Sequence, residues 1–131
     1  MARVALTGAG GFIGRAVAQR LRAAGHVVIA CDLTPAPGAS AVDLRDRGAV
    51  AAWMREARPE RAVHAGAISG PMAVGGDLRR LYDVNVAGAG NLLAALAAEG
   101  VSRLVHLSSN SVYAPAADGA PLTEDAPLFC A

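Results

Sequence analysis

Short apolar runs and amphipathic stretches alternate along most of the chain. A buried β-strand is predicted where about four to eight mostly apolar residues are bounded by glycine, proline or polar residues. Runs of this kind lie at 3–7, 26–32, 41–44, 61–66 and 103–109. An amphipathic helix is predicted where apolar residues recur every three or four positions. Stretches with that spacing lie between the runs, at 12–25, 46–57 and 77–99.

Two of the predicted helices define their apolar faces clearly. In the first, Ile13, Val17 and Leu21 are four residues apart, and Gly25 is a typical residue for the C-terminal stop. In the longest predicted helix, 77–99, the residues that recur every three or four positions lie on one face: Leu78, Leu81, Asn85, Ala89, Leu92 and Leu96. Two segments have loop composition, 33–40 with its prolines and glycine, and 115–131 with proline, alanine and acidic residues.

Strands that alternate with helices indicate an α/β fold. Such chains form a doubly wound parallel sheet, because right-handed crossovers place helices on both faces. We expect five strands in the order 3-2-1-4-5 and a single unit over 1–131, since neither a repeat nor a linker interrupts the pattern.

Composition narrows the class of protein. The chain of 131 residues is 53% hydrophobic and 18% charged, which excludes a disordered protein. Its net charge is +1 with the basic residues spread out, so we expect neither nucleic-acid nor membrane binding through bulk charge. We also expect no membrane-spanning helix. Cys31 and Cys130 lie far apart without metal-type spacing, so no metal site is expected and a reduced, cytoplasmic setting is predicted.

All twelve basic residues are arginine, and the sequence contains no lysine. A mechanism that requires a lysine therefore cannot be completed by these residues alone.

A glycine-rich turn, TGAGGFIG at 7–14, joins the first predicted strand to the first helix. Gly8 permits a tight turn, Gly11 lets the backbone approach a pyrophosphate, and Gly14 allows close helix packing. The free N–H groups of the helix N-terminus favour phosphate. The alternative is an ordinary glycine-rich turn, but the strand–turn–helix context favours dinucleotide binding.

Two acidic residues extend this prediction. Asp32 ends the second predicted strand, 18 residues after Gly14, where a carboxylate can bind the adenosine ribose and repel the additional phosphate of NADP. NAD is therefore favoured as the cofactor, with a solvated loop acid as the alternative. Asp43 is a candidate acceptor for the adenine amino group, but a helix-capping or surface acid fits its spacing nearly as well.

Taken in order, several motifs resemble the NAD-dependent epimerase/dehydratase family, the extended short-chain dehydrogenase/reductases, which have a Rossmann fold. The similarity covers essentially the whole chain. It is carried by TGAGGFIG (7–14), Asp32, VDLRD (42–46), VHAGA (63–67), NVAGAGNLL (85–93), LVHLSSNSVYAP (104–115) and PLTEDAPL (121–128).

The resemblance implies a set of cofactor-binding residues. The pyrophosphate would lie against Gly8, Gly11, Phe12, Ile13 and Gly14, the adenosine against Asp32, Asp43 and Leu44, and the nicotinamide ribose against Ala65, Gly66 and Ala67. Relatives often carry a bulkier residue at 65 and alanine at 66. Asn85 would support the site from below, or else be a polar residue paired among helices. Ser108 joins this set as the neighbour of Ser109.

The same resemblance assigns catalysis to Ser109, whose hydroxyl would bind the substrate oxygen, with Asn110 and Tyr113 on the substrate side. The alternative for Ser109 is a hydroxyl bound by its own turn. The family's catalytic tyrosine lies in a Tyr-x-x-x-Lys pattern, where the lysine charge favours tyrosinate. Residue 117 is alanine and residue 86 is valine, so neither Tyr113 nor Tyr82 completes that pattern. Tyr113 is therefore not predicted to be the base.

The implied function is an NAD-dependent oxidoreductase or epimerase/dehydratase that acts on a sugar nucleotide, sugar or sugar acid. We expect the catalytic tyrosine helix, the sixth strand and the substrate domain to be missing from this chain, which would be inactive alone. In relatives the helix matching 77–99 contributes to a homodimer, so self-association is expected. The alternative is a non-catalytic NAD-binding or sensing module, although such a module would not need the Ser109 turn.

Overall fold

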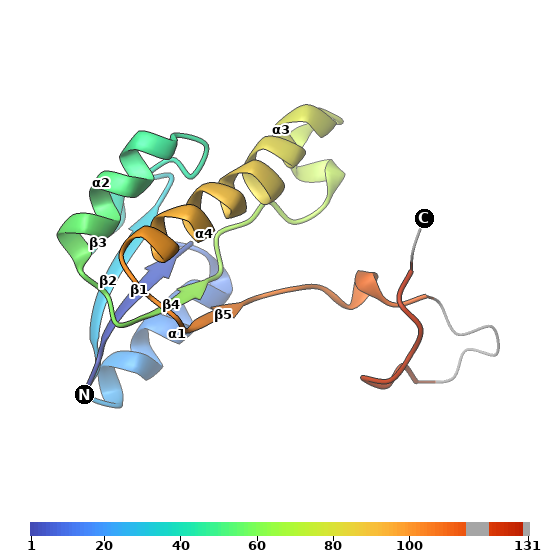
Figure 1. Ribbon diagram of the computed structural model, residues 1–131. Helices are drawn as coiled ribbons and strands as arrows, with labels where there is room; N and C mark the ends of the chain where they lie inside the picture. Colours follow the sequence, from blue (N-terminus) through green and yellow to red (C-terminus); the bar gives the residue numbers. More distant parts are fainter. Residues whose placement is uncertain (115–120, 130–131) are drawn as a thin grey trace.

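The computed structural model describes residues 1–114 and 121–129. Within them a parallel sheet lies between helices (Figure 1). The strands are β1 (Arg3–Thr7), β2 (Val27–Asp32), β3 (Ala39–Ala41), β4 (Arg61–His64) and β5 (Leu104–His106). The helices are α1 (Phe12–Ala23), α2 (Arg47–Ala57), α3 (Leu78–Tyr82) and α4 (Gly88–Ala98). Shorter turns are η1 (Pro71–Val74), the π-helical η2 (Asp83–Ala87) and η3 (Asn110–Val112). Part of the predicted C-terminal loop, 115–120, and Cys130 lie outside the described residues.

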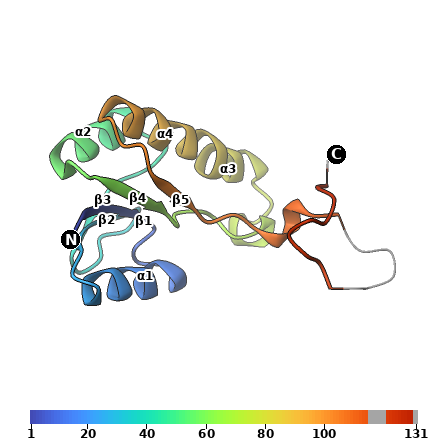
Figure 2. The ribbon, with the colours of Figure 1, turned by 60° about the horizontal axis from the view of Figure 1, so that its bottom comes forward.

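The predicted strand order is confirmed. The sheet runs β3-β2-β1-β4-β5, and every neighbouring pair is parallel. Figure 2 shows α1 on one face of the sheet and α2 with α4 on the other. Thr7, the last residue of the central strand, is in register with Cys31 on one side and His64 on the other. The carboxyl ends of β1, β2 and β4 therefore meet at one edge of the sheet, directly before the glycine turn.

The third strand does not match its prediction. We expected it at 41–44, but β3 covers Ala39–Ala41, and the residues after it form a turn. The shift arises because β3 pairs with the end of β2, with Ala39 opposite Ala30 and Ala41 opposite Asp32. The chain then turns before α2, where the Asp46 carboxylate caps the helix by accepting from the Ala49 N–H at 2.9 Å. Two residues that were assigned to a loop thus belong to the sheet.

The apolar core is divided by the sheet. Beneath α2 and α4, the larger cluster contains Val50, Trp53, Met54, Leu92 and Leu96, all buried. On the other face, Leu6 and Ala18 belong to a smaller cluster under α1. Burial of a side chain the size of leucine or methionine stabilises a fold by roughly 1.5–3 kcal/mol. The face that holds α2 and α4 therefore contributes the greater part of the apolar stabilisation.

The predicted helix 77–99 is a continuous helical run, but its face changes along its length. It consists of α3, the π-helical turn η2 and α4. Leu92 and Leu96 are buried as expected, whereas Leu78 at the other end is 63% exposed. A π-helical turn holds one residue more than an α-helical turn, which rotates the residues before it away from the core face.

This run also corrects the expectation that no segment could cross a membrane. By length and composition alone, the 21-residue run Leu78–Ala98 is long and apolar enough to do so, since an 18-residue window within it has a mean hydropathy of 1.2. In the structure Leu92, Ala95 and Leu96 of this run pack into the core beneath it. Its apolar character is thus used in part for packing within the domain.

Candidate functional site

A cleft of about 520 Å³ opens where the carboxyl ends of β1, β2 and β4 meet. In a doubly wound sheet this is the usual position for a ligand. Of the predicted site residues, eight line the cleft: Gly8, Gly11, Asp32, Asp43, Leu44, Ala65, Gly66 and Ala67. Segments up to about 60 residues apart in the sequence are thus brought to one place by the parallel pairing.

The glycine turn is shaped by two close backbone approaches. Gly8 has φ +70°, and a Cβ at this residue would lie 2.6 Å from backbone atoms of Ala65 and Gly66. A Cβ at Gly14 would collide with the carbonyl of Gly8, so the first turn of α1 packs directly on the glycine turn. The N-terminus of α1 has neither a side-chain cap nor an acidic residue in its first turn. Its N–H groups are therefore available to an anionic ligand.

Asp32 is tied to the glycine turn. Its Oδ2 accepts from the Gly10 N–H at 2.8 Å, and its Oδ1 accepts from the Thr34 N–H at 3.4 Å. Cys31 beside it is buried, and burial, followed by the charge of Asp32, raises the pKa of the thiol to about 12. The thiol is therefore protonated near neutral pH and is not a nucleophile. The carboxylate of Asp32 is the functional group that this end of β2 offers to a ligand.

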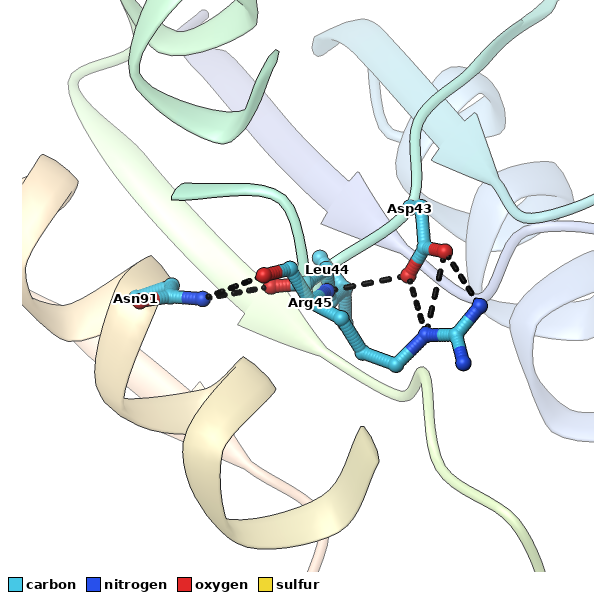
Figure 3. Close-up of polar contacts among 4 residues, drawn as sticks. All are labelled: Asp43, Leu44, Arg45 and Asn91. Atoms are coloured by element: carbon cyan, nitrogen blue, oxygen red, sulfur yellow. Dashed lines mark hydrogen bonds and ion pairs between the residues drawn. The ribbon is translucent and has the colours of Figure 1, made fainter. Parts of the chain in front are cut away.

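Asp43 and Arg45 form an ion pair at the turn between β3 and α2 (Figure 3). Arg45 Nη2 lies 2.6 Å from Asp43 Oδ2. The hydrogen bond from Arg45 is the main reason that the pKa of the Asp43 carboxyl is lowered. Asp43 is thus an ionised acceptor at the cleft. The predicted alternative of a helix cap does not apply, because Asp46 caps α2.

A buried polar link connects the ends of β1 and β4. The Thr7 hydroxyl accepts from the Gly66 N–H at 3.2 Å and lies 2.6 Å from His64 Nδ1. Burial, and then the neighbouring His106, lower the pKa of His64 to about 4. His64 is therefore neutral near pH 7. The link holds the segment after β4 against β1, where Gly66 lines the cleft.

Asn85 lies outside the cleft lining and acts on it through another residue. Its Oδ1 accepts from the Ile68 N–H at 2.8 Å, and its Nδ2 donates to the Ile68 carbonyl at 2.9 Å. Ile68 lines the cleft. The Asn85 side chain therefore braces the loop after β4. It supports the cleft through Ile68 and does not itself form part of the cleft wall.

The other predicted residues lie away from the cleft lining. Phe12 and Ile13 begin α1 with exposed side chains, and Gly14 is buried under the turn. The segment after β5 extends away from the sheet (orange in Figure 1) and carries Ser108, Ser109, Asn110 and Tyr113. Ser109 Oγ accepts from the Ser111 N–H at 3.1 Å. This contact is the one expected under the alternative for Ser109, a hydroxyl bound by its own turn. Tyr113 forms a β-bridge with Leu128.

Several lining residues were not predicted. They are Thr7, Gly10, Cys31, the loop 33–36, Val42, Ile68, Arg80 and Val84. Thr7 and Gly10 lie within the glycine-rich turn at 7–14, although neither was assigned to the cofactor. Arg80 belongs to α3 and directly follows Arg79. The sequence does not indicate which of these two adjacent arginines lies at the cleft.

Comparison with known proteins gives a consistent result. A family model described as "NAD dependent epimerase/dehydratase family" matches residues 4–129. The chain is 33% identical over 147 residues to UDP-glucose 4-epimerase 4 of Oryza sativa subsp. japonica, covering 95% of this chain and 39% of the relative. It is 33% identical over 111 residues to dTDP-4-dehydrorhamnose reductase of Mycolicibacterium smegmatis, covering 85% of this chain and 31% of the relative.

Solved structures show the same similarity. The UDP-glucose 4-epimerase of Thermus thermophilus in complex with NAD superposes with a TM-score of 0.85 at 31% identity, covering 96% of this chain and 44% of that one. The UDP-glucose 4-epimerase of Stenotrophomonas maltophila, with bound NAD and formylated UDP-arabinopyranose, superposes with a TM-score of 0.87 at 28% identity. The match covers 98% of this chain and 43% of that one. The chain thus spans between 31% and 44% of the length of these relatives.

Proposed function

The chain belongs to the NAD-dependent epimerase/dehydratase family, and from that premise we propose that it is the cofactor-binding part of an NAD-dependent enzyme acting on a sugar nucleotide, a sugar or a sugar acid. The support is twofold. Among the relatives matched over most of the chain are a UDP-glucose 4-epimerase and a dTDP-4-dehydrorhamnose reductase. Both solved structures described above hold NAD, one of them together with a formylated UDP-arabinopyranose.

The observation that carries the proposal is the pairing of the glycine turn with Asp32 in one cleft. The crowded backbone at Gly8 and the uncapped N-terminus of α1 suit a pyrophosphate, which needs N–H donors and close approach. Asp32, at the other side of the turn, suits the ribose hydroxyls, and its charge disfavours a 2′-phosphate. The residues of this cleft therefore fit NAD better than NADP.

The remaining cofactor contacts extend from this pair. Asp43 would accept from the adenine amino group, and Ala65, Gly66 and Ala67 would lie along the nicotinamide ribose, where small residues permit a close approach. When bound, NAD supplies the hydride-transfer chemistry. Ser109 would donate its hydroxyl proton to the reacting substrate oxygen, since in its turn the Oγ only accepts, from the Ser111 N–H. The base would be a tyrosine supplied from outside this sequence, since no lysine is available here to activate one.

We further propose that the helical run from α3 to α4 pairs with a second copy. Its outward residues Leu78, Tyr82, Val86 and Leu93 are each more than half exposed, which leaves an apolar stripe on the outside of the molecule. Burial of such a stripe is favourable.

Titration of the 131-residue chain with NAD, monitored by calorimetry, tests the binding proposal. We expect saturable binding, and no NADH formation with UDP-glucose as the probe substrate. Absence of NAD binding would contradict the proposed function. NADH formation by this chain alone would contradict the assignment of the base to residues outside it. A full-length product of 13.2 kDa from the natural source would favour the alternative of an NAD-binding module.

A further inference from the structure

A second, smaller pocket lies between α1 and the loop that joins β2 to β3. It has a volume of about 120 Å³ and is lined by one face of α1, by buried alanines and by residues 36–39. We call it the rear pocket. Ala36 lines both the rear pocket and the cleft described above, so the two share one wall. A group bound in the rear pocket would therefore lie next to the cleft without entering it.

The polar side chains of the rear pocket come from α1. Arg15, Gln19 and Arg22 line it, and their spacing of four and then three residues places them on one face of the helix. The two arginines are seven residues apart, or about 10.5 Å along the helix axis, so they flank Gln19 from opposite ends. The other residues of α1 and the sheet that line the pocket are buried alanines, namely Ala9, Ala18 and Ala30. Because alanine side chains end at Cβ, space remains between the arginines.

The opposite side of the rear pocket is a tight turn at 36–39. The Ala39 N–H donates to the Ala36 carbonyl at 3.0 Å, with Pro37 and then Gly38, at φ +72°, between them. Proline followed by a glycine of positive φ is typical of a type II turn. A Cβ at Gly38 would lie 3.6 Å from Arg22 Nη2, so the guanidinium lies against the turn. The Gly38 N–H has no hydrogen-bond partner within residues 1–114 and 121–129, which leaves this donor available next to Arg22.

The charges around the rear pocket are positive and unbalanced. Asp32 is the sole acidic residue in the sequence 1–42, and its carboxylate lines the cleft, where it accepts from the Gly10 and Thr34 N–H groups. Neither Arg15 nor Arg22 forms an ion pair with a carboxylate of the described residues. Two guanidinium groups therefore face one small space without an anionic partner.

An oxyanion supplies the partner that these groups lack. A guanidinium donates two parallel hydrogen bonds to a phosphate, and such charge-assisted bonds are roughly twice as strong as neutral ones. A tetrahedral phosphate has oxygens on opposite sides, so two arginines that approach from opposite ends can bind it together, whereas a carboxylate has only two oxygens in one plane. We propose that the rear pocket is a binding site for one phosphate group, held between Arg15 and Arg22 and separate from the glycine turn. The site goes beyond the proposed function and does not depend on it.

Nuclear magnetic resonance tests the site residue by residue. Inorganic phosphate is titrated into the isotope-labelled chain at constant ionic strength, with sodium chloride as the comparison, and amide and arginine Nε–H signals are followed. The signals of Gly38, Arg15 and Arg22 should shift and saturate, with a Kd of about 1 mM or tighter. The shifts should persist with NAD present, because NAD occupies the glycine turn, where phosphate would otherwise have a second place to bind. Methyl phosphate is titrated in the same way; the tighter of the two probes identifies the free ion or a monoester as the source of the group, and either supports the site.

Variants of α1 separate a built site from general attraction to a basic helix. Arg15→Gln and Arg22→Gln should each raise the Kd for phosphate by roughly tenfold or more, the change expected on loss of a hydrogen bond to a charged group. Arg22→Lys keeps the charge without the planar fork and should restore part of the affinity. Arg20→Gln is the matched control, because it removes the same charge from the same helix at an exposed position that does not line the pocket. Its Kd should equal that of the wild type. All of these side chains are exposed, and a melting curve by circular dichroism confirms that each variant is folded.

Three results would overturn the inference. The first is a Gly38 signal that shifts no more with phosphate than with chloride, and the second is an equal loss of affinity in Arg22→Gln and Arg20→Gln. The third is a shift of Gly10 and Gly11 in place of Gly38 that NAD abolishes, which would assign the phosphate to the glycine turn. A chain that binds phosphate at Gly38 but does not bind NAD would contradict the proposed function alone, since the two sites are followed by different signals.

Discussion

The N–H of Gly10 donates to Oδ2 of Asp32 at 2.8 Å, which ties the glycine turn after β1 to the end of β2. A Cβ at Gly10 would lie only 3.2 Å from the same oxygen, so the two residues are adjacent as well as bonded. The carboxylate that we assign to the ribose is thus oriented by the turn that we assign to the pyrophosphate. The two recognition elements of the cleft are parts of one structure.

Replacement of Asp32 by alanine should change the choice of cofactor. Loss of the negative charge removes repulsion of the 2′-phosphate, so the Kd for NADP relative to NAD should improve by roughly tenfold, about 1.4 kcal/mol. Isothermal titration with both dinucleotides measures this ratio. Glu56→Gln, on the exposed side of α2, is the control for a loss of negative charge. An unchanged ratio in Asp32→Ala would remove this residue from the ribose site.

Two glycine-to-alanine substitutions in helices should have opposite effects on stability. Gly14→Ala places a Cβ into the carbonyl of Gly8, and such overpacking costs about 1–3 kcal/mol. Gly90→Ala in α4 meets nothing within 4 Å, and the gain in helix propensity should stabilise the fold by about 0.5–1 kcal/mol. Urea unfolding measures both. Equal changes would contradict the close packing of α1 on the glycine turn.

Acidification should destabilise the fold through His64. Burial lowers its pKa from 6.5 to about 4, so the unfolded state binds more protons between these values. The stability contributed by the neutral histidine is fully present above pH 6.5 and is lost as the pH falls toward 4. The free energy of unfolding, measured in urea from pH 7 to pH 4, should decline less steeply in His64→Gln. Parallel declines would assign the pH dependence to other groups.

Self-association should depend on the outward residues of the run from α3 to α4. Val86→Glu and Leu93→Glu place charges in the exposed apolar stripe, which should weaken a dimer by at least tenfold in Kd, since burial of an unpaired charge is costly. Sedimentation velocity across a concentration series measures this. Val27→Glu, at the exposed start of β2, serves as the control. A wild-type chain that stays monomeric at high concentration would contradict the proposal.

Much of the fold followed from local patterns. The period of the apolar residues distinguished strands from helices, and the alternation of the two led to a parallel sheet in the confirmed order. The glycine turn and Asp32 could be assigned because each lies directly at the end of a strand, and parallel pairing must bring such ends together. Where the position of a residue in the fold depends on its neighbours along the chain, the spacing in the sequence is enough to predict it.

Other features depended on contacts between distant segments. The bounds of β3 were set by pairing with β2, and the face of the long helix was changed by the π-helical turn η2. The bonds from Asn91 to the carbonyls of Leu44 and Arg45 join residues 47 and 46 positions apart. Thr7 and His64 meet across 57 positions. The sequence by itself determined the elements, their order and the glycine turn with Asp32, because these follow from local periodicity and parallel pairing. Only the tertiary structure decided which polar side chains brace the cleft, because that depends on how far each helix approaches the sheet.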